Sequence, residues 1–190
     1  MTKVYTLITG GSAGIGRSLA FECARRKQDL LLVALPGHEL EETAGKIKTE
    51  FNVDVQWLGV DLAQNEGPKK VCDWCLANNF RVNFLINNAG IAGSESFESS
   101  DPDYSDLRIM LNIRSLVLLT RYMLPLMRQT LPGKILNLGS LSGYFCIPYK
   151  SVYSASKAFV ISFSKSLRLE LEDSGIQVFV LNPNGVESNT

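Results

Sequence analysis

The sequence predicts a doubly wound α/β fold, in which a parallel sheet of about six strands carries helices on both faces. Two observations support this prediction. Short apolar runs alternate along the chain with longer helical patterns, which is the order of elements that builds parallel sheets. Several apolar runs, such as Leu30–Val33, are unbroken, and strands of that kind are buried on both faces.

The first half of the chain is expected to hold three strand–helix pairs. The apolar run at 4–8 ends in a cluster of glycines, after which a helix is expected at 17–27. A second apolar run at 30–34 precedes a polar helix at 39–50. Residues 53–60 alternate between apolar and polar side chains, as a strand does, and a helix is expected at 68–80.

The second half is expected to continue the same order with two longer helices. Strands at 82–86, 134–138 and 176–181 are separated by helices at 103–129 and 152–173. Pro125 removes a backbone donor from the first of these helices, so we expect a kink or an early end there. Leu116–Leu119 leaves that helix without a polar face, which predicts burial under other segments of this chain or against a partner subunit.

Length and composition bound the class of protein. The chain has 190 residues without a linker or repeat, which suits one domain over 1–190. Lysine and arginine total 19, as do aspartate and glutamate, so a neutral chain gives no reason to expect a nucleic-acid partner. No unbroken apolar run has the length of a membrane span, and no secretory signal precedes the first strand, so a cytoplasmic protein is expected.

The four cysteines are too few and too scattered for a disulfide framework. Cys72 and Cys75 have the spacing of a redox pair or of half a metal site. The chain has one histidine, His38, and no second cysteine pair, so a zinc site lacks ligands. No metal is therefore expected, and we interpret the two cysteines as ordinary residues on one helix face.

A glycine-rich turn follows the first strand. Thr9–Gly16 runs into a helix, whose first N–H groups and positive dipole end favour a phosphate. Its spacing, G-x-x-x-G-x-G, differs from the dinucleotide fingerprint and lacks the lysine of a P-loop. The turn therefore predicts phosphate binding without naming the ligand, and a merely tight turn is the alternative.

Tyr153 and Lys157 open the last long helix, in the sequence Y-S-A-S-K. Residues with this spacing share a helix face, and a nearby cation favours the phenolate that serves in acid–base chemistry. Taken alone, the spacing is more often structural. However, Ser140 and Asn87–Gly90 directly follow two predicted strands, and open α/β sheets bind ligands at those carboxyl ends. We therefore expect all of these residues to gather at one edge of the sheet.

The motifs together resemble the short-chain dehydrogenase/reductase family. T-G-x-x-x-G-I-G at 9–16, N-N-A-G at 87–90, Asn112, Ser140 and Y-S-A-S-K at 153–157 occur in the family's order through the whole chain. The resemblance implies a Rossmann-type sheet with strand order 3-2-1-4-5-6. It also implies hydride transfer between a nicotinamide cofactor and an alcohol or carbonyl substrate, near the 3-oxoacyl and 17β-hydroxysteroid reductase-like branch.

The resemblance also implies residue roles. Tyr153 would be the general acid or base, Ser140 would hydrogen-bond the substrate oxygen, and Lys157 would hold the nicotinamide ribose. Asn112 would support a proton-relaying water, and Asp61 would contact adenine, with a strand-end cap as its alternative. The full set implied to contact the cofactor is Gly10, Ser12, Gly14, Ile15, Gly16, Asp61, Leu62, Asn88, Ala89, Gly90, Tyr153, Lys157 and Pro183.

Two segments depart from the family pattern. An acid or an arginine just after the second strand usually decides between NAD and NADP, and Ala34–Pro36 offers neither. The absence of an acid, with Arg17 nearby, favours NADP. After the sixth strand, Asn184 and Ser188 stand where the family has glycine and threonine. The chain ends at Thr190, so we expect the family's substrate lid and last strand to be absent.

Two classes of function remain open at this point. An NAD(P)-dependent oxidoreductase acting on a small carbonyl or alcohol compound is favoured by the intact set of Asn112, Ser140, Tyr153 and Lys157. A non-catalytic nucleotide-binding, sensing or scaffolding protein is the alternative, favoured by the expected loss of the lid. The apolar helices at 103–129 and 152–173 predict a homodimer or homotetramer.

Overall fold

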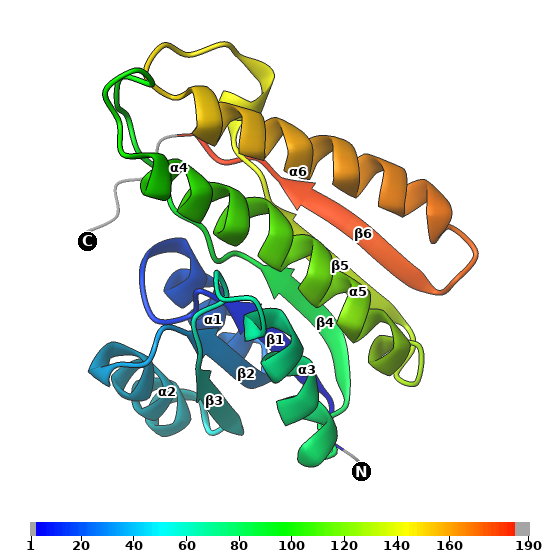
Figure 1. Cartoon of the computed structure of the whole chain (residues 1–190). Helices are drawn as coiled ribbons and strands as arrows, with labels where there is room; N and C mark the ends of the chain where they lie inside the picture. Colours follow the sequence, from blue (N-terminus) through cyan, green and yellow to red (C-terminus); the bar gives the residue numbers. More distant parts are fainter. Residues whose placement is uncertain (1–2, 185–190) are drawn as a thin grey trace.

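The computed structural model describes residues 3–184, in which one parallel sheet carries helices on both faces (Figure 1). Its order, β3-β2-β1-β4-β5-β6, confirms the predicted fold class and strand order. Residues 185–190, with the departure at Ser188, lie outside the described part of the chain. The strands are β1 (Tyr5–Thr9), β2 (Asp29–Ala34), β3 (Val55–Gly59), β4 (Val82–Asn87), β5 (Gly133–Leu138) and β6 (Ile176–Leu181).

The helices follow the predicted order, with one long helix interrupted. Between α4 and α5, a π-helical turn, η1 (Met110–Arg114), replaces the regular helix expected there. α5 ends at Met127, two residues after Pro125, in agreement with the early end predicted at that proline. The α-helices are α1 (Gly14–Arg25), α2 (His38–Phe51), α3 (Gly67–Ala77), α4 (Pro102–Ile109), α5 (Ser115–Met127) and α6 (Ser151–Glu170), and a 3-10 turn, η2, spans Leu141–Tyr144.

Two layers of side chains form the core, one on each face of the sheet. Leu7 and Leu31 pack with residues of α3, α5 and α6, the helices on the near face in Figure 1. Ile8 and Leu32 point the other way and pack with α1 and α2. This alternation explains the unbroken apolar runs, since both faces of the central strands are covered.

β6 departs from the expectation of burial on both faces. Ile176 and Val178 are buried beneath α6, but Phe179 and Leu181 are 44% and 45% exposed. Phe179 and Leu181 lie on the face of the sheet that carries α1 and α2. Those helices pack with β1–β3, so no helix of the described residues covers β6 on that face.

The apolar run in α5 is only partly buried. Leu116 and Leu119 lie in the core, whereas Val117 and Leu118 are half-buried. By length and composition alone, Pro102–Met127 suffices to cross a membrane, with a mean hydropathy of 1.3 in its most apolar window. The expectation of no membrane span was drawn from unbroken apolar runs alone and did not consider this helix. Core helices of soluble proteins can be equally long and apolar.

Cys72 and Cys75 are both buried thiols on the inner side of α3. Burial raises the pKa of the Cys75 thiol to about 12, so this residue is a protonated part of the core. Within residues 3–184 no three metal-binding side chains come together. The interpretation of the two cysteines as residues of one helix face therefore agrees with the structure.

Candidate active site

The glycine turn between β1 and α1 depends on two close approaches of the backbone. Gly10 has a φ of +65°, and a Cβ on Gly16 would lie 2.0 Å from the carbonyl oxygen of Gly10. α1 begins at Gly14, three residues earlier than expected, so Gly16 lies inside its first turn. Its N-cap, Ala13, has no side chain that accepts a hydrogen bond, which leaves the first N–H groups for an anionic ligand.

Asn88 joins the glycine turn to the end of β4. Its side-chain nitrogen Nδ2 donates hydrogen bonds to the carbonyl oxygens of Thr9 (2.9 Å) and Gly10 (3.2 Å). In return, Thr9 Oγ1 accepts from the N–H groups of Asn88 (2.9 Å) and Ala89 (3.0 Å). The structure thus brings the two expected cofactor segments into direct contact.

Tyr153 and Lys157, the two residues expected to be catalytic, lie at the start of α6. Lys157 Nζ is 5.8 Å from the centre of the Tyr153 ring and donates a 2.8 Å hydrogen bond to the carbonyl oxygen of Leu138. Lys157 is 7% exposed, and this burial lowers the pKa of its ammonium to about 8. A Cβ on Gly90 would lie 3.7 Å from Nζ, so the N-N-A-G segment passes beside the lysine. Tyr153 is half-buried, within reach of a ligand.

Ser140 follows β5 and caps the short η2 turn. Its Oγ accepts hydrogen bonds from the N–H (3.2 Å) and the hydroxyl (2.8 Å) of Ser142. A Cβ on Gly143 would lie 2.8 Å from the backbone nitrogen of Ala158, so η2 rests on α6 beside Lys157. The N–H of Leu141 donates to the carbonyl oxygen of Pro183 at 3.1 Å, which brings the end of β6 to the same edge.

Asn112 lies in the π turn η1 and connects two segments of the site. It is 2% exposed, and its Oδ1 accepts from the N–H of Ile91 at 2.9 Å. Its Nδ2 donates to the carbonyl oxygen of Ile91 (3.0 Å) and to Ser156 Oγ (3.1 Å). The side chain therefore ties the segment after β4 to α6, a brace that sequence reasoning did not reveal.

A second polar network lies directly beneath the site. Asn87 Nδ2 donates to Thr120 Oγ1 at 2.9 Å and to Asn137 Oδ1 at 2.8 Å, and Asn137 Nδ2 donates to Ser164 Oγ at 2.9 Å. These four buried side chains connect β4 and β5 to α5 and α6. Sequence reasoning missed this network because its members are far apart in the chain, and only Asn87 belongs to a motif.

Asp61 and Leu62 stand at the end of β3. The Asp61 carboxylate accepts hydrogen bonds from the N–H of Ala63 (2.9 Å) and from Gln64 Nε2 (3.1 Å), so it caps the turn that follows. This is the alternative considered for Asp61, and it leaves further lone pairs for a ligand. Leu62 is 4% exposed and belongs to the core, so a cofactor would meet its backbone.

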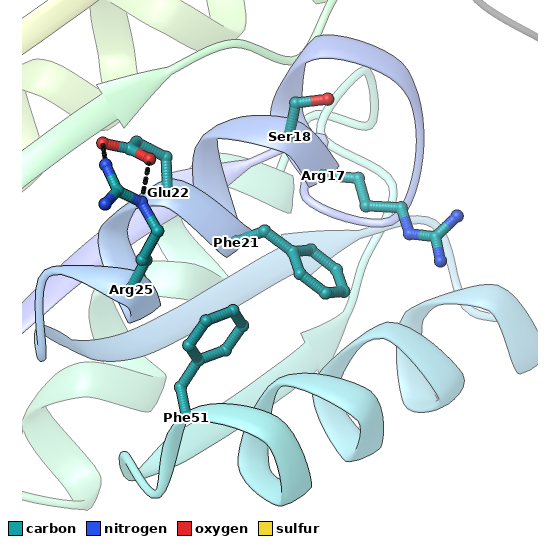
Figure 2. Close-up of a pocket in the computed structure, with 6 residues that line it drawn as sticks. All are labelled: Arg17, Ser18, Phe21, Glu22, Arg25 and Phe51. Atoms are coloured by element: carbon teal, nitrogen blue, oxygen red, sulfur yellow. Dashed lines mark hydrogen bonds and ion pairs between the residues drawn. The ribbon is translucent and has the colours of Figure 1, made fainter.

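The end of β2 shapes the side of the site where an adenosine ribose would lie. Leu35 is 64% exposed there, and no acid stands in Ala34–Pro36. Thr43 Oγ1 donates to the carbonyl oxygen of Ser12 at 3.3 Å, which ties α2 to the glycine turn. Arg17 extends toward α2 (Figure 2), where the hydrogen bond and charge of Lys46, with a smaller effect of Arg17, lower the pKa of the Glu42 carboxyl.

An open groove of about 470 Å³ runs along α1, lined by that helix and the end of α2 (Figure 2). Phe21 and Phe51 meet edge to face at 5.9 Å, and Arg17 extends away from the paired Glu22 and Arg25. Ser140, Tyr153 and Lys157 are not among the residues that line this groove. It is separate from the edge where Tyr153 and Lys157 lie.

Comparison with known proteins identifies many relatives. The sequence model of the family described as short chain dehydrogenase matches residues 4–190. Very-long-chain 3-oxoacyl-CoA reductase from Rattus norvegicus is 34% identical, with 92% of this chain and 56% of the relative covered. The 11-beta-hydroxysteroid dehydrogenase of Pinus massoniana is 32% identical, with 100% and 53% covered. The chain therefore spans about half the length of these curated relatives.

Solved structures resemble this chain through its whole described length. The short-chain dehydrogenase from Sphingobium yanoikuyae in complex with NADPH has a TM-score of 0.90 at 36% identity, with 98% of this chain and 72% of that chain covered. L-sorbose reductase from Gluconobacter frateurii, complexed with NADPH and L-sorbose, has a TM-score of 0.92 at 30% identity, with 98% and 71% covered.

Proposed function

The chain belongs to the short-chain dehydrogenase/reductase family, and we propose that it transfers a hydride between a nicotinamide cofactor and an alcohol or carbonyl substrate. The observation that carries this proposal is the buried ammonium of Lys157 beside the Tyr153 ring, at the sheet edge that also holds the glycine turn. A buried ammonium beside a tyrosine favours the phenolate, which makes the hydroxyl suited to proton chemistry.

The residues present fit a dinucleotide. Gly10 and Gly16 allow the β1–α1 turn to pack closely on itself and on Asn88, and the first turn of α1 offers N–H groups to a pyrophosphate. Gly90 brings the segment after β4 close to Lys157, whose ammonium would donate to a ribose hydroxyl. When bound, the cofactor would supply the hydride chemistry.

The protein's own side chains would handle the proton. In the direction of reduction, the Tyr153 hydroxyl would protonate the carbonyl oxygen, so that the product is an alcohol. Ser140 would donate a hydrogen bond to the same oxygen, where negative charge develops. Lys157 would stabilise the phenolate left on Tyr153 until a proton from solvent restores the hydroxyl. Oxidation would use the same groups in reverse.

We further propose NADP as the preferred cofactor. Leu35 leaves the end of β2 without a carboxylate to repel a 2′-phosphate, and Arg17 supplies a cation on the neighbouring helix. The NADPH complexes of two similar structures support this choice.

For the substrate, we propose a hydrophobic carbonyl compound. Three large rings, on the segments that follow β4 and β5, are well exposed: Phe97 (70%), Phe145 (63%) and Tyr149 (66%). Exposed aromatic side chains on these segments suit an apolar ligand. The names of the curated relatives, which refer to long-chain 3-oxoacyl and steroid compounds, agree with this proposal.

We also propose that the chain forms a homo-oligomer through α4, α5 and α6. The half-buried Val117 and Leu118 leave an apolar stripe on α5 that a second copy would cover. Light scattering after size-exclusion chromatography tests this proposal. A monomeric mass at micromolar concentration would refute it.

The first test of function is titration of the chain with NADPH and NADH, followed by energy transfer from Trp57 and Trp74. Turnover is then measured as loss of NADPH absorbance with butanone, octanone and acetophenone. Tyr153→Phe is expected to retain NADPH affinity within about twofold and to lose at least about a hundredfold in turnover. Binding without turnover in the wild-type chain would instead support the non-catalytic nucleotide-binding alternative.

A further inference from the structure

Arg108, outside the motifs discussed so far, is among the most deeply buried charged side chains of the described residues. It lies near the end of α4 and is 3% exposed. Its Nη1 forms an ion pair with the Glu95 carboxylate, which is itself only 30% exposed. Its guanidinium also lies over the Tyr104 ring, 4.1 Å from the centre. These partners offset part of its lost hydration, although Nη2 is buried without a hydrogen-bond partner among the described residues.

The segment that Arg108 holds is the one that follows the N-N-A-G motif. Arg108 Nε and the Tyr104 hydroxyl both donate to the carbonyl oxygen of Ala92, at 3.3 Å and 3.1 Å. The chain then crosses the guanidinium so closely that a Cβ on Gly93 would lie 1.9 Å from Nη2. With a φ of +149°, Gly93 also has a backbone conformation that other residues rarely adopt. The segment 91–95 is thus fitted to Arg108.

The same segment is joined to the start of α6. The N–H of Glu95 donates a 2.7 Å hydrogen bond to the carbonyl oxygen of Tyr149, which lies four residues before Tyr153. The cavity between these segments, lined in part by Arg108, Lys150 and Ser151, has about 10 Å³, no more than one water occupies. In Figure 1 the two segments meet at the end of the molecule where α4 and α6 begin.

Two side chains of one helical stretch therefore hold this segment. Asn112 binds it at Ile91, and Arg108, one turn earlier, binds it at Ala92 and Glu95. Between them they place the segment relative to Lys157 on one side and to the residues before Tyr153 on the other. Glu95 is held at two points, through its carboxylate by Arg108 and through its N–H by the carbonyl oxygen of Tyr149.

We propose that Arg108 is a positioning residue, and that its ion pair with Glu95 sets the width of the substrate pocket by holding segment 91–95 against the start of α6. This inference rests on the proposed function and concerns the substrate side of that same site. It predicts an effect on the binding of the carbonyl compound, since the glycine turn and the cofactor segments make no contact with Arg108 in the described structure.

The test replaces both charges at once, in the double variant Arg108→Met, Glu95→Met. Removing only Arg108 would leave a partly buried carboxylate without its partner and so destabilise the whole domain, whereas exchanging a buried ion pair for apolar side chains is often neutral. Arg168→Met is the matched control, because Arg168 Nε likewise donates to a backbone carbonyl, that of Val178 (2.7 Å), at the other end of α6.

Four readouts separate positioning from stability. The double variant is expected to unfold near the urea midpoint of the wild type and to bind NADPH within about twofold of it. The KM for octanone is expected to rise about tenfold, with kcat changed less than about threefold. Amide hydrogen exchange is expected to accelerate in peptides that cover 91–99 and 145–152, but not in β4 or β5. The Arg168→Met control is expected to keep the wild-type KM and exchange in those peptides.

Different outcomes would contradict the role of Arg108 and the proposed function. Wild-type turnover together with an unchanged KM and unchanged exchange in the double variant would overturn the role of Arg108 alone. A wild-type chain that binds NADPH but reduces none of the ketones would overturn the proposed function and, with it, the substrate role of the ion pair. An apparent kcat that falls in proportion to the loss of folded protein, with an unchanged KM, would show that Arg108 is merely structural.

Discussion

Lys157 Nζ donates a hydrogen bond of 2.8 Å to the carbonyl oxygen of Leu138, the last residue of β5. The bond connects the start of α6 to the carboxyl edge of the sheet. It also satisfies one of the three ammonium donors in a place where water has little access, because Lys157 is 7% exposed. The remaining donors are left for Tyr153 and for a ligand.

This burial makes the stability of the chain depend on pH through Lys157. Burial lowers the pKa of its ammonium from 10.5 to about 8, so between those values the unfolded chain holds a proton that the folded chain has lost. Stability therefore increases as the pH rises through that window. Between pH 7.5 and 9.5 we expect the free energy of unfolding of the wild type to increase by about 2 kcal/mol relative to Lys157→Met.

Urea denaturation of both proteins at several pH values measures this difference. Lys134→Met, which removes an exposed lysine of β5, serves as the control and is expected to follow the wild type. Parallel curves for the wild type and Lys157→Met would contradict the prediction, because they would mean that the ammonium is hydrated in the folded chain.

Asn112 should stabilise the domain through the bonds it makes to Ile91. In Asn112→Ala the N–H and the carbonyl oxygen of Ile91 both lose their partner in a part-buried place. We expect the free energy of unfolding to fall by about 2 to 3 kcal/mol. Asn65→Ala, at an exposed position, is expected to change it by less than about 0.5 kcal/mol. Equal urea midpoints for the two variants would rule out the brace.

The fold could be predicted because its signals are local and repeated. Runs such as Leu30–Val33 identify central strands, and parallel strands place their carboxyl ends at one edge. Gly10, Asn88, Ser140 and Tyr153 could therefore be expected at a common site before any contact was known. The exposed Phe179 shows the limit of the argument, since an apolar pattern does not say which half of a sheet face the helices cover.

The supports of the site could not be predicted in this way. The π turn at Met110–Arg114 has no pattern in the sequence that separates it from regular helix. The ion pair of Arg108 with Glu95 joins a helix to a segment without secondary structure, and its geometry depends on Gly93. Interactions of this kind arise from tertiary packing, which periodicity and spacing do not encode.

Leu35 should control the choice of cofactor. Leu35→Asp places a carboxylate directly after β2, where it would repel a 2′-phosphate and accept hydrogen bonds from free ribose hydroxyls. We expect the Kd for NADPH to rise about tenfold or more and the Kd for NADH to fall, as measured by energy transfer from the tryptophans. Leu35→Asn, without the charge, is the control. An unchanged ratio of the two Kd values would show that the cofactor ribose does not lie at Leu35.

Alanine substitutions at Gly16 and Gly45 are expected to change the free energy of unfolding in opposite directions. A Cβ on Gly16 would lie 2.0 Å from the carbonyl oxygen of Gly10, whereas one on Gly45 would meet nothing within 4 Å. Gly45→Ala is expected to stabilise α2 by about 0.5 to 1 kcal/mol, because alanine loses less backbone entropy in a helix.

For Gly16→Ala we expect a loss of more than about 3 kcal/mol, because α1 must move away from the glycine turn. The same movement displaces the first N–H groups of α1, so NADPH binding is expected to disappear even where the chain remains folded. Urea denaturation and NADPH titration of both variants measure these effects. Retention of wild-type NADPH affinity by Gly16→Ala would mean that the close approach of Gly16 to Gly10 is not needed to form the phosphate site.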